Sequence, residues 1–335
     1  MVAPLSPVVQ NDNSDYHDVD HGRSDFAGIK VRIAILLCTF NGERFLAQQL
    51  ESIARQTCPD WFVVVSDDGS TDSTLELLRE YSERWGDGKL SVRQGPRSGY
   101  AANFLSLTCD KTIEADYFAW ADQDDIWQAN KLECALQKLQ ERSSQSPALY
   151  CGRTELIDEQ GARIGLSPLF ERPVGFANAL VQSVGGGNTM VFNQAARQLF
   201  QQAGEDLDVV SHDWWAYLIV AGAGGSVIYD TSPTILYRQH DANVIGAASG
   251  VMVQLMRVRM QFRGRFRGWN QKNIAALESI RFQLNEESRM RLDRFQRARS
   301  SRGLARVIWL RRSGVYRQSL WGNLGLVLAT LFNGI

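Results

Sequence analysis

The chain has 335 residues, of which 44% are hydrophobic and 22% are charged, and its formal net charge is −1. This composition excludes a wholly disordered chain, and the length is enough for one large hydrophobic core or two smaller ones. The charge is distributed unevenly, because seventeen arginines and lysines but four acids lie between Arg257 and Arg317.

Residues 1–29 are predicted to be a disordered leader. They are rich in Asp, Asn, Ser and Val, and they lack the positive segment and apolar core of a signal peptide. The five cysteines of the chain form no Cys-x-x-Cys pair, and three have apolar neighbours in or beside predicted strands or helices. We therefore expect reduced core thiols in a cytosolic protein and no zinc site.

Two units of strand, polar loop and helix open the folded part of the chain. Residues 31–37 and 61–65 form apolar, β-branched runs, and an amphipathic helix follows each of them. Strands are also expected near 90–92 and at 117–121, and a helix is expected to begin near Trp127. Successive units of this kind predict a right-handed, mostly parallel sheet flanked by helices, which is a Rossmann-like α/β fold.

The loop after the first strand excludes two familiar nucleotide sites. Where a dinucleotide fold carries Gly-x-Gly-x-x-Gly, residues 38–44 read Cys-Thr-Phe-Asn-Gly-Glu-Arg, which lacks the glycines of a pyrophosphate nest. The P-loop lysine pattern is missing from the same loop. A nicotinamide enzyme or a P-loop enzyme is therefore not expected.

Acidic side chains follow two of the predicted strands instead. Asp67 and Asp68 come after the second strand, and Asp122, Asp124 and Asp125 come after the fourth. Because both loops open at one edge of the sheet, one can hold Mg²⁺ or Mn²⁺ with a substrate phosphate. The other can accept the imide N–H of a uracil or thymine base. The alternative for either loop alone is a turn or a helix cap, and Asp125 stays open between supporting the site and capping a helix.

Three segments of the chain form a recognisable set. They read Thr39-Phe40-Asn41-Gly42, Asp67-Asp68-Gly69-Ser70-Thr71-Asp72 and Asp122-Gln123-Asp124-Asp125-Ile126-Trp127. Together they resemble the family 2 glycosyltransferases of GT-A fold, in the branch of the bacterial rhamnosyltransferases, which implies a catalytic domain at 30–250. The resemblance implies that Asp67 or Asp68 contacts the nucleobase and that Asp122 and Asp124 form an Asp-x-Asp site for the metal and the diphosphate. It places around the nucleotide sugar Thr39, Asn41, Glu43, Asp67, Asp68, Asp122, Gln123 and Arg238.

Two later segments are similar to further parts of such enzymes. Ser211-His212-Asp213-Trp214-Trp215 resembles the acidic motif of inverting members, which makes Asp213 the candidate base for a sugar hydroxyl. The alternative for Asp213 is an acid stabilised in the first turn of a helix. The segment 237–243 resembles the part that closes over the diphosphate, where Arg238 would bind phosphate oxygens. His240 would donate to a phosphate or complete the metal shell, or else make a structural hydrogen bond.

Two glycine-containing segments stay open. The triplet 185–187 is expected either to bring backbone close to the donor or acceptor or to be an ordinary flexible loop. Residues 99–103 lie where relatives line the nucleotide pocket. Ala102 stands where many of them carry a basic residue, so this contact is left out of the expected site.

Residues 251–335 are predicted to form a basic, amphipathic helical region. Arginines are interleaved with Met, Phe and Trp, and leucines dominate the end. The stretch 320–335 is too short and too interrupted by glycine for a membrane span of about twenty residues. We expect peripheral attachment to the inner face of an anionic cell membrane and no nucleic acid partner. Packing against an acidic partner chain, or against the acidic first half of this chain, is the alternative.

These features predict an inverting glycosyltransferase that uses Mg²⁺ or Mn²⁺ in bacterial cell-surface polysaccharide synthesis. The resemblance implies dTDP-L-rhamnose as the donor, with a UDP-sugar or another dTDP-deoxysugar as the alternative, and the expected acceptor is a glycan that a lipid can carry. One rival is a metal-dependent phosphohydrolase or nucleotidyltransferase that uses the same aspartates. The other is a non-catalytic membrane or nucleic-acid-binding protein in which the acidic loops are caps.

Overall fold

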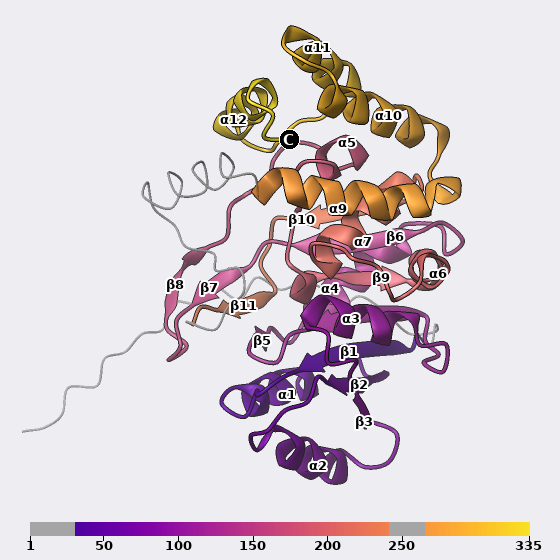
Figure 1. Ribbon diagram of the computed structural model, residues 1–335. Coiled ribbons are helices and arrows are strands. Elements are labelled where there is room, and N and C mark those ends of the chain that lie inside the picture. Colours follow the sequence, from indigo (N-terminus) through magenta and orange to yellow (C-terminus); the bar gives the residue numbers. More distant parts are fainter. Residues whose placement is uncertain (1–30, 241–264) are drawn as a thin grey trace, which may run out of the picture. The chain divides into compact units, whose positions relative to one another are not determined.

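The computed structural model describes residues 31–240 and 265–335, and a seven-stranded sheet organises the first of these ranges (Figure 1). Its strands are β1 (Ile33–Thr39), β2 (Trp61–Asp67), β3 (Leu90–Gln94), β4 (Tyr117–Ala121), β6 (Ala148–Gly152), β9 (Val191–Asn193) and β10 (Ser226–Asp230). They lie in the order β10-β6-β9-β4-β1-β2-β3. β9 is antiparallel to β4 and β6, while all other neighbours are parallel. The predicted mostly parallel α/β sheet is confirmed, with one antiparallel strand added.

Helices cover both faces of this sheet because its central strand is apolar on both sides. All seven residues of β1 are buried, and alternate residues from Ile33 and from Ala34 belong to two different hydrophobic clusters. The first cluster includes α1 (Leu46–Ala54), α2 (Thr74–Trp85) and α4 (Lys131–Gln140). The second includes α3 (Tyr100–Cys109), α5 (Phe176–Ala179), α6 (Gln194–Ala203) and α7 (His212–Gly222).

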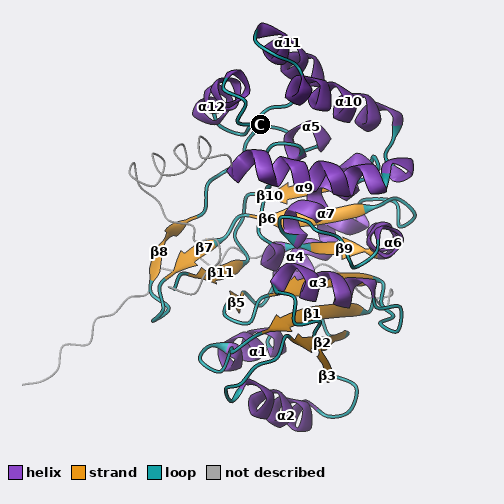
Figure 2. Cartoon of the chain, in the orientation of Figure 1, coloured by secondary structure: helices purple, strands orange, loops and turns teal. Residues whose placement is uncertain are grey.

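A second, smaller sheet was not predicted from the sequence (Figure 2). It consists of β5 (Ile126–Trp127), β11 (Ile235–Arg238), β7 (Glu155–Ile157) and β8 (Arg163–Leu166), in that order. The helix expected near Trp127 begins at Lys131 instead, because Ile126 and Trp127 pair with β11. This pairing joins the acidic loop after β4 to the segment that carries Arg238 and His240.

Four helices form the described C-terminal part and confirm its helical character: α9 (Arg265–Ser279), α10 (Glu286–Ser300), α11 (Leu304–Ser313) and α12 (Leu320–Leu331). Leu277 of α9 and Phe295 of α10 belong to the same hydrophobic cluster as Trp215 of α7. The predicted leader and residues 251–264 of the predicted helical region lie outside the described residues. Within the described ranges, no helix combines the length and hydropathy needed to cross a membrane.

All five cysteines are free thiols. Cys38 and Cys151 are buried in the core, and the other three are partly buried. Burial raises the pKa of the Cys151 thiol to about 12, which keeps it protonated at neutral pH. The cysteines therefore behave as apolar packing groups.

Candidate active site

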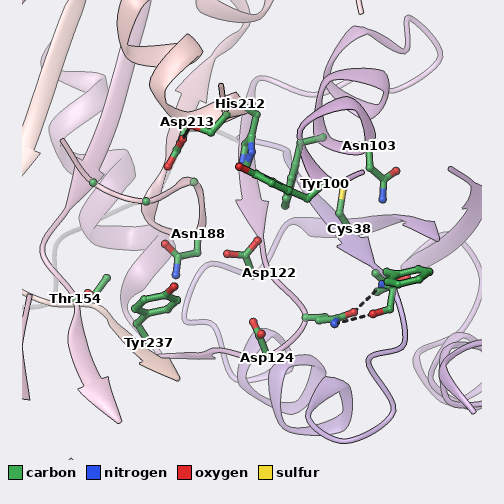
Figure 3. Close-up of a pocket in the computed structure, with 18 of the residues that line it drawn as sticks. Cys38, Tyr100, Asn103, Asp122, Asp124, Thr154, Asn188, His212, Asp213 and Tyr237 are labelled. Carbon is green, nitrogen blue, oxygen red and sulfur yellow. Dashed lines mark hydrogen bonds between the residues drawn. The ribbon is translucent and has the colours of Figure 1, made fainter. Parts of the chain in front are cut away.

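A cavity of about 1040 Å³ opens where β1, β2 and β4 end. The strand register pairs Thr39 with Asp67 and Leu37 with Ala121, so the loops after these three strands meet at one edge of the sheet. The cavity wall includes, among the predicted site residues, Thr39, Asn41, Asp68, Asp122, Gln123, Asp124, Asp213 and His240. Figure 3 labels three of them, Asp122, Asp124 and Asp213. The fold thus brings together segments that are up to two hundred residues apart in the chain.

The two adjacent aspartates after β2 have different surroundings. Asp67 is 5% exposed, and its carboxylate accepts hydrogen bonds from the Thr39 hydroxyl at 2.9 Å and from two backbone N–H groups of its own loop. Asp68 lines the cavity and accepts from the N–H groups of Arg97 at 2.6 Å and Gly99 at 3.0 Å. A carboxylate has about four acceptor positions, so Asp68 retains capacity for a ligand. Of the two, Asp68 is the one placed at the cavity.

Three other predicted residues fix the loops around the cavity. Gln123 accepts a hydrogen bond from the Phe40 N–H at 2.8 Å and donates to the Phe40 carbonyl at 3.1 Å. Gly42 permits this contact, because a Cβ there would collide with Gln123 Oε1. Asn41 and Glu43 each accept from a backbone N–H of the loop after β2, at 2.8 Å and 2.9 Å. Asn41 and Gln123 also line the cavity, whereas Glu43 is not part of its wall.

The carboxyl groups of Asp122, Asp124 and Asp213 gather in the cavity (Figure 3). Among the described residues, none donates a hydrogen bond to the Asp122 carboxylate. Burial, followed by the charges of Asp124 and Asp213, raises the pKa of Asp122 to about 8. Asp122 therefore lies where its charge is poorly compensated by the protein.

This environment fits a divalent cation. A cation beside Asp122 would favour the ionised carboxylate and so oppose the rise in its pKa. Within residues 31–240 and 265–335, no three His, Cys, Asp or Glu side chains are grouped to hold a metal ion. Mg²⁺ commonly takes one or two carboxylates and completes its shell with water and substrate phosphate oxygens. Asp122 and Asp124 are residues of the type and number that such an ion requires from a protein.

His240 and Arg238 support the loop that carries Asp124. His240 Nε2 lies 2.7 Å from Asp124 Oδ2, and its ring packs against Phe45 with the centroids 5.4 Å apart. Arg238 is 1% exposed, and its guanidinium donates to the carbonyls of Asp124 at 3.0 Å and Glu159 at 2.8 Å. The guanidinium is therefore not placed as the open fork for phosphate oxygens that the sequence predicts, because β11 turns it inward. His240 does reach the cavity wall, as the partner of Asp124.

Asp125 is fully buried and supports the site without facing the cavity. It accepts hydrogen bonds from Asn188 Nδ2 at 2.5 Å and from the Arg238 N–H at 3.2 Å. These bonds connect the glycine turn before β9 with β11. Asp125 does not cap α4, because this helix begins six residues later. Of its two alternatives, support of the site is therefore the one that the structure shows.

α7 holds Asp213 in its first turn. Ser211 Oγ and the Trp214 N–H both donate to Asp213 Oδ1, the latter at 2.6 Å. Among the described residues, none donates to Asp213 Oδ2, and the side chain lines the cavity. Asp213 therefore lies at a helix start and also faces the cavity, and its role as the base stays a prediction.

His212 explains why the neighbouring turn carries glycine. The His212 ring is 4% exposed and stacks on Phe104 with centroids 4.0 Å apart, and neither ring nitrogen has a hydrogen-bond partner among the described residues. Burial lowers the pKa of His212 to about 4, so the ring is neutral at pH 7. A Cβ on Gly187 would collide with His212 Nε2. Glycine at position 187 therefore allows the turn to pack closely against the His212 ring.

Among the side chains of the cavity wall that sequence reasoning missed are Tyr100, Asn188 and Tyr237 (Figure 3). Burial, and then the charges of Asp213 and Asp122, raises the pKa of Tyr100 to about 12, and its hydroxyl donates to the Val210 carbonyl at 3.4 Å. Each of these three lies within or beside a segment that the sequence singled out. Their position in or beside a motif was the only feature of the sequence that could have indicated that they line the cavity.

Comparisons with known proteins identify the family of the chain. The family model described as Glycosyl transferase family 2 matches residues 34–199, a range that ends before Asp213 and His240. The chain is 30% identical over 225 residues to dTDP-rhamnosyl transferase RfbG of Shigella flexneri, covering 63% of this chain and 74% of that protein. It is 23% identical over 232 residues to the uncharacterized glycosyltransferase RT0329 of Rickettsia typhi, covering 64% and 66% respectively. The structure of S. aureus TarS 1–349 in complex with UDP-GlcNAc matches with a TM-score of 0.50 and 16% identity, covering 85% of this chain and 93% of that one.

Proposed function

Because the chain belongs to glycosyltransferase family 2 and has the GT-A fold, we propose that it transfers a sugar from a nucleotide diphosphate to a hydroxyl of a glycan acceptor, with inversion at C1. One observation carries this proposal. Asp68, Asp122, Asp124 and Asp213 line a single cavity, although they come from three different parts of the chain. Asp68 supplies a carboxylate for the nucleobase, and Asp122 and Asp124 supply carboxylates that reach the diphosphate through a cation. Asp213 supplies the carboxylate for the acceptor hydroxyl.

The donor we propose is dTDP-L-rhamnose. Asp68 would accept the imide N–H that thymine and uracil share, so this contact favours a pyrimidine nucleotide without separating dTDP from UDP. The similarity to a protein named dTDP-rhamnosyl transferase favours dTDP. A UDP-sugar is the alternative donor.

The chemistry assigned to the protein is one displacement at the sugar C1. Asp213 Oδ2 takes the proton of the acceptor hydroxyl as the new bond to C1 forms. Asp122 and Asp124 would hold Mg²⁺ or Mn²⁺, which when bound supplies positive charge to the diphosphate leaving group. Inversion converts a β-linked L-rhamnosyl donor into an α-L-rhamnoside.

Calorimetry on the purified full-length protein tests the donor site. We expect dTDP-L-rhamnose to bind in the presence of Mg²⁺ or Mn²⁺ and binding to weaken strongly when EDTA removes the ion. Asp122→Asn should weaken binding in the presence of the metal, whereas Asp87→Asn, an exposed acid after α2, should not. If neither dTDP- nor UDP-sugars bind with metal present, the proposal is wrong.

A further inference from the structure

The C-terminal helix α12 exposes an apolar face of unusual extent. Leu320 is 86% exposed, Trp321 is 81% exposed and Phe332, just after the helix, is 72% exposed. Leu324, Leu328 and Leu331 are exposed as well, and their spacing of three or four residues places them on the same side of the helix as Leu320. The helix Leu320–Leu331 contains no charged residue.

The neighbouring helix α11 has a second exposed apolar face, which is followed by exposed arginines. Leu304 is 76% exposed and Ile308 is 51% exposed, and Arg311 and Arg312 follow them one helical turn later. α11 and α12 contact each other, and Arg306 of α11 donates to the Thr330 carbonyl of α12 at 3.4 Å. We call the exposed residues of these two helices, with the flanking Arg302 and Phe332, the α11–α12 surface.

The charge of this region selects among the partners that would cover it. Residues 301–335 contain five arginines and no acid or lysine. The side chains of Arg302, Arg311 and Arg312 are exposed and make no ion pair with any described residue. A second copy of the chain would oppose like charges at this surface, and a nucleic acid would leave the leucines and Trp321 without apolar contacts. An anionic lipid bilayer takes both the arginines and the apolar side chains.

We propose that the α11–α12 surface docks the protein onto an anionic lipid bilayer. With twelve residues, α12 is about 18 Å long, against a hydrocarbon thickness of about 30 Å, so it lies in the plane of the interface. Its leucines and Trp321 enter the acyl region, and Arg302, Arg311 and Arg312 meet the phosphates of the headgroups.

The docked surface is connected to the cavity by a short path. The segment between α11 and α12 is hydrogen-bonded to α5 and to the residues after it, since the Tyr316 carbonyl accepts from Asn178 Nδ2 at 2.9 Å and the Gln318 N–H donates to Gln182 at 2.9 Å. Phe170, before α5, and Ser183, after it, line the cavity. A lipid-borne acceptor is the substrate class that benefits from this connection. This last step rests on the proposed function, whereas the docking itself does not.

Cosedimentation of the full-length protein with vesicles tests the proposal. We expect binding to vesicles of phosphatidylcholine with phosphatidylglycerol and little binding to phosphatidylcholine alone. The double variants W321S/L324S and R311Q/R312Q should each lower the partition coefficient at least about tenfold. The first removes apolar side chains from the acyl region, and the second removes two arginines, each of which contributes about fivefold near an anionic surface. The arginine effect should weaken at high salt.

Matched controls separate docking from misfolding and from the catalytic proposal. L75S removes an exposed leucine of α2, and R55Q/R79Q removes two exposed arginines near α1 and α2; both should bind vesicles as the wild type does. All variants should keep the wild-type melting temperature and nucleotide binding. Equal binding to neutral and anionic vesicles, or an equal loss in the controls, overturns the proposal. So does a lipid-free dimer that W321S/L324S dissociates, because the surface would then belong to a second copy.

Discussion

Asp213 is the side chain on which the proposed proton transfer depends, and Asp213→Asn tests it cleanly. An asparagine Oδ1 can still accept from Ser211 and Trp214, so the first turn of α7 should keep its hydrogen bonds. We expect kcat for transfer to fall by a factor of about 10²–10⁴, the usual range for loss of a general base. Donor affinity by calorimetry should stay within about twofold. Asp206→Asn, an exposed acid shortly before α7, is the control and should keep full activity, and a variant at Asp213 that loses donor binding as well would assign this acid to structure.

The neighbours Asp67 and Asp68 should separate into a structural role and a binding role. Asp67→Asn weakens the hydrogen bonds that a charged carboxylate accepts from Thr39 and from its own loop, so we expect stability to fall by about 1–3 kcal/mol in urea denaturation. Asp68→Asn should instead weaken nucleotide affinity at least about tenfold with a smaller change in stability. The opposite pattern would mean that the buried acid is the one that meets the base.

Residue types and motif order predicted the acidic side chains of the cavity wall, but not which side chains make their hydrogen bonds inside the protein instead. Asp122, Asp124 and Asp213 face the cavity as the motifs indicate. Arg238 does not, because strand β11 directs it toward the carbonyl of Asp124 and that of Glu159, and such pairing with backbone leaves no trace in sequence. Tyr237, the residue before it, lines the wall instead. A shift of one position along a strand reverses the side to which a side chain points.

At the scale of elements, the contact between α7 and the glycine turn makes stability depend on pH through His212. The folded pKa is about 4 and the ordinary value is 6.5, so between these values the unfolded chain binds a proton that the folded chain does not. Stability from this group is complete above pH 6.5 and is lost as pH falls toward 4, by at most about 3 kcal/mol. His212→Leu removes this group, so its urea stability should fall less than that of the wild type between pH 7 and pH 5. Equal losses in both proteins would show that His212 titrates normally.

The long elements were predictable and the short ones were not. β1, β2 and the helices after them have strong apolar periodicity, which the sequence shows directly. β5, β7 and β11 have two to four residues each, too few for a period, and they pair segments about eighty to one hundred residues apart. β9 appears as a strand only because β4 and β6 flank it. The site depends on these short strands, since they set the positions of Tyr237 and His240.

At the scale of the whole molecule, the basic C-terminal helices are expected to unfold together with the sheet. Phe295 of α10 is fully buried in the hydrophobic cluster that also contains Leu277 of α9 and Trp215 of α7. Phe295→Ala should therefore lower the free energy of unfolding by about 3–5 kcal/mol. Thermal denaturation should show one transition, shifted to lower temperature, with nucleotide binding lost in the same transition.

The matched variant for this test is Phe282→Ala, which removes a phenylalanine that is 69% exposed in the turn before α10. Surface substitutions of this kind change stability by less than about 0.5 kcal/mol, so its transition should coincide with that of the wild type. The contrary result is two separate transitions, with Phe295→Ala shifting only one of them and nucleotide binding surviving that one. The C-terminal helices would then be an independent domain. Because α7, which carries Asp213, and α10 contribute residues to the same hydrophobic cluster, a single transition instead makes the C-terminal helices part of the support for the site.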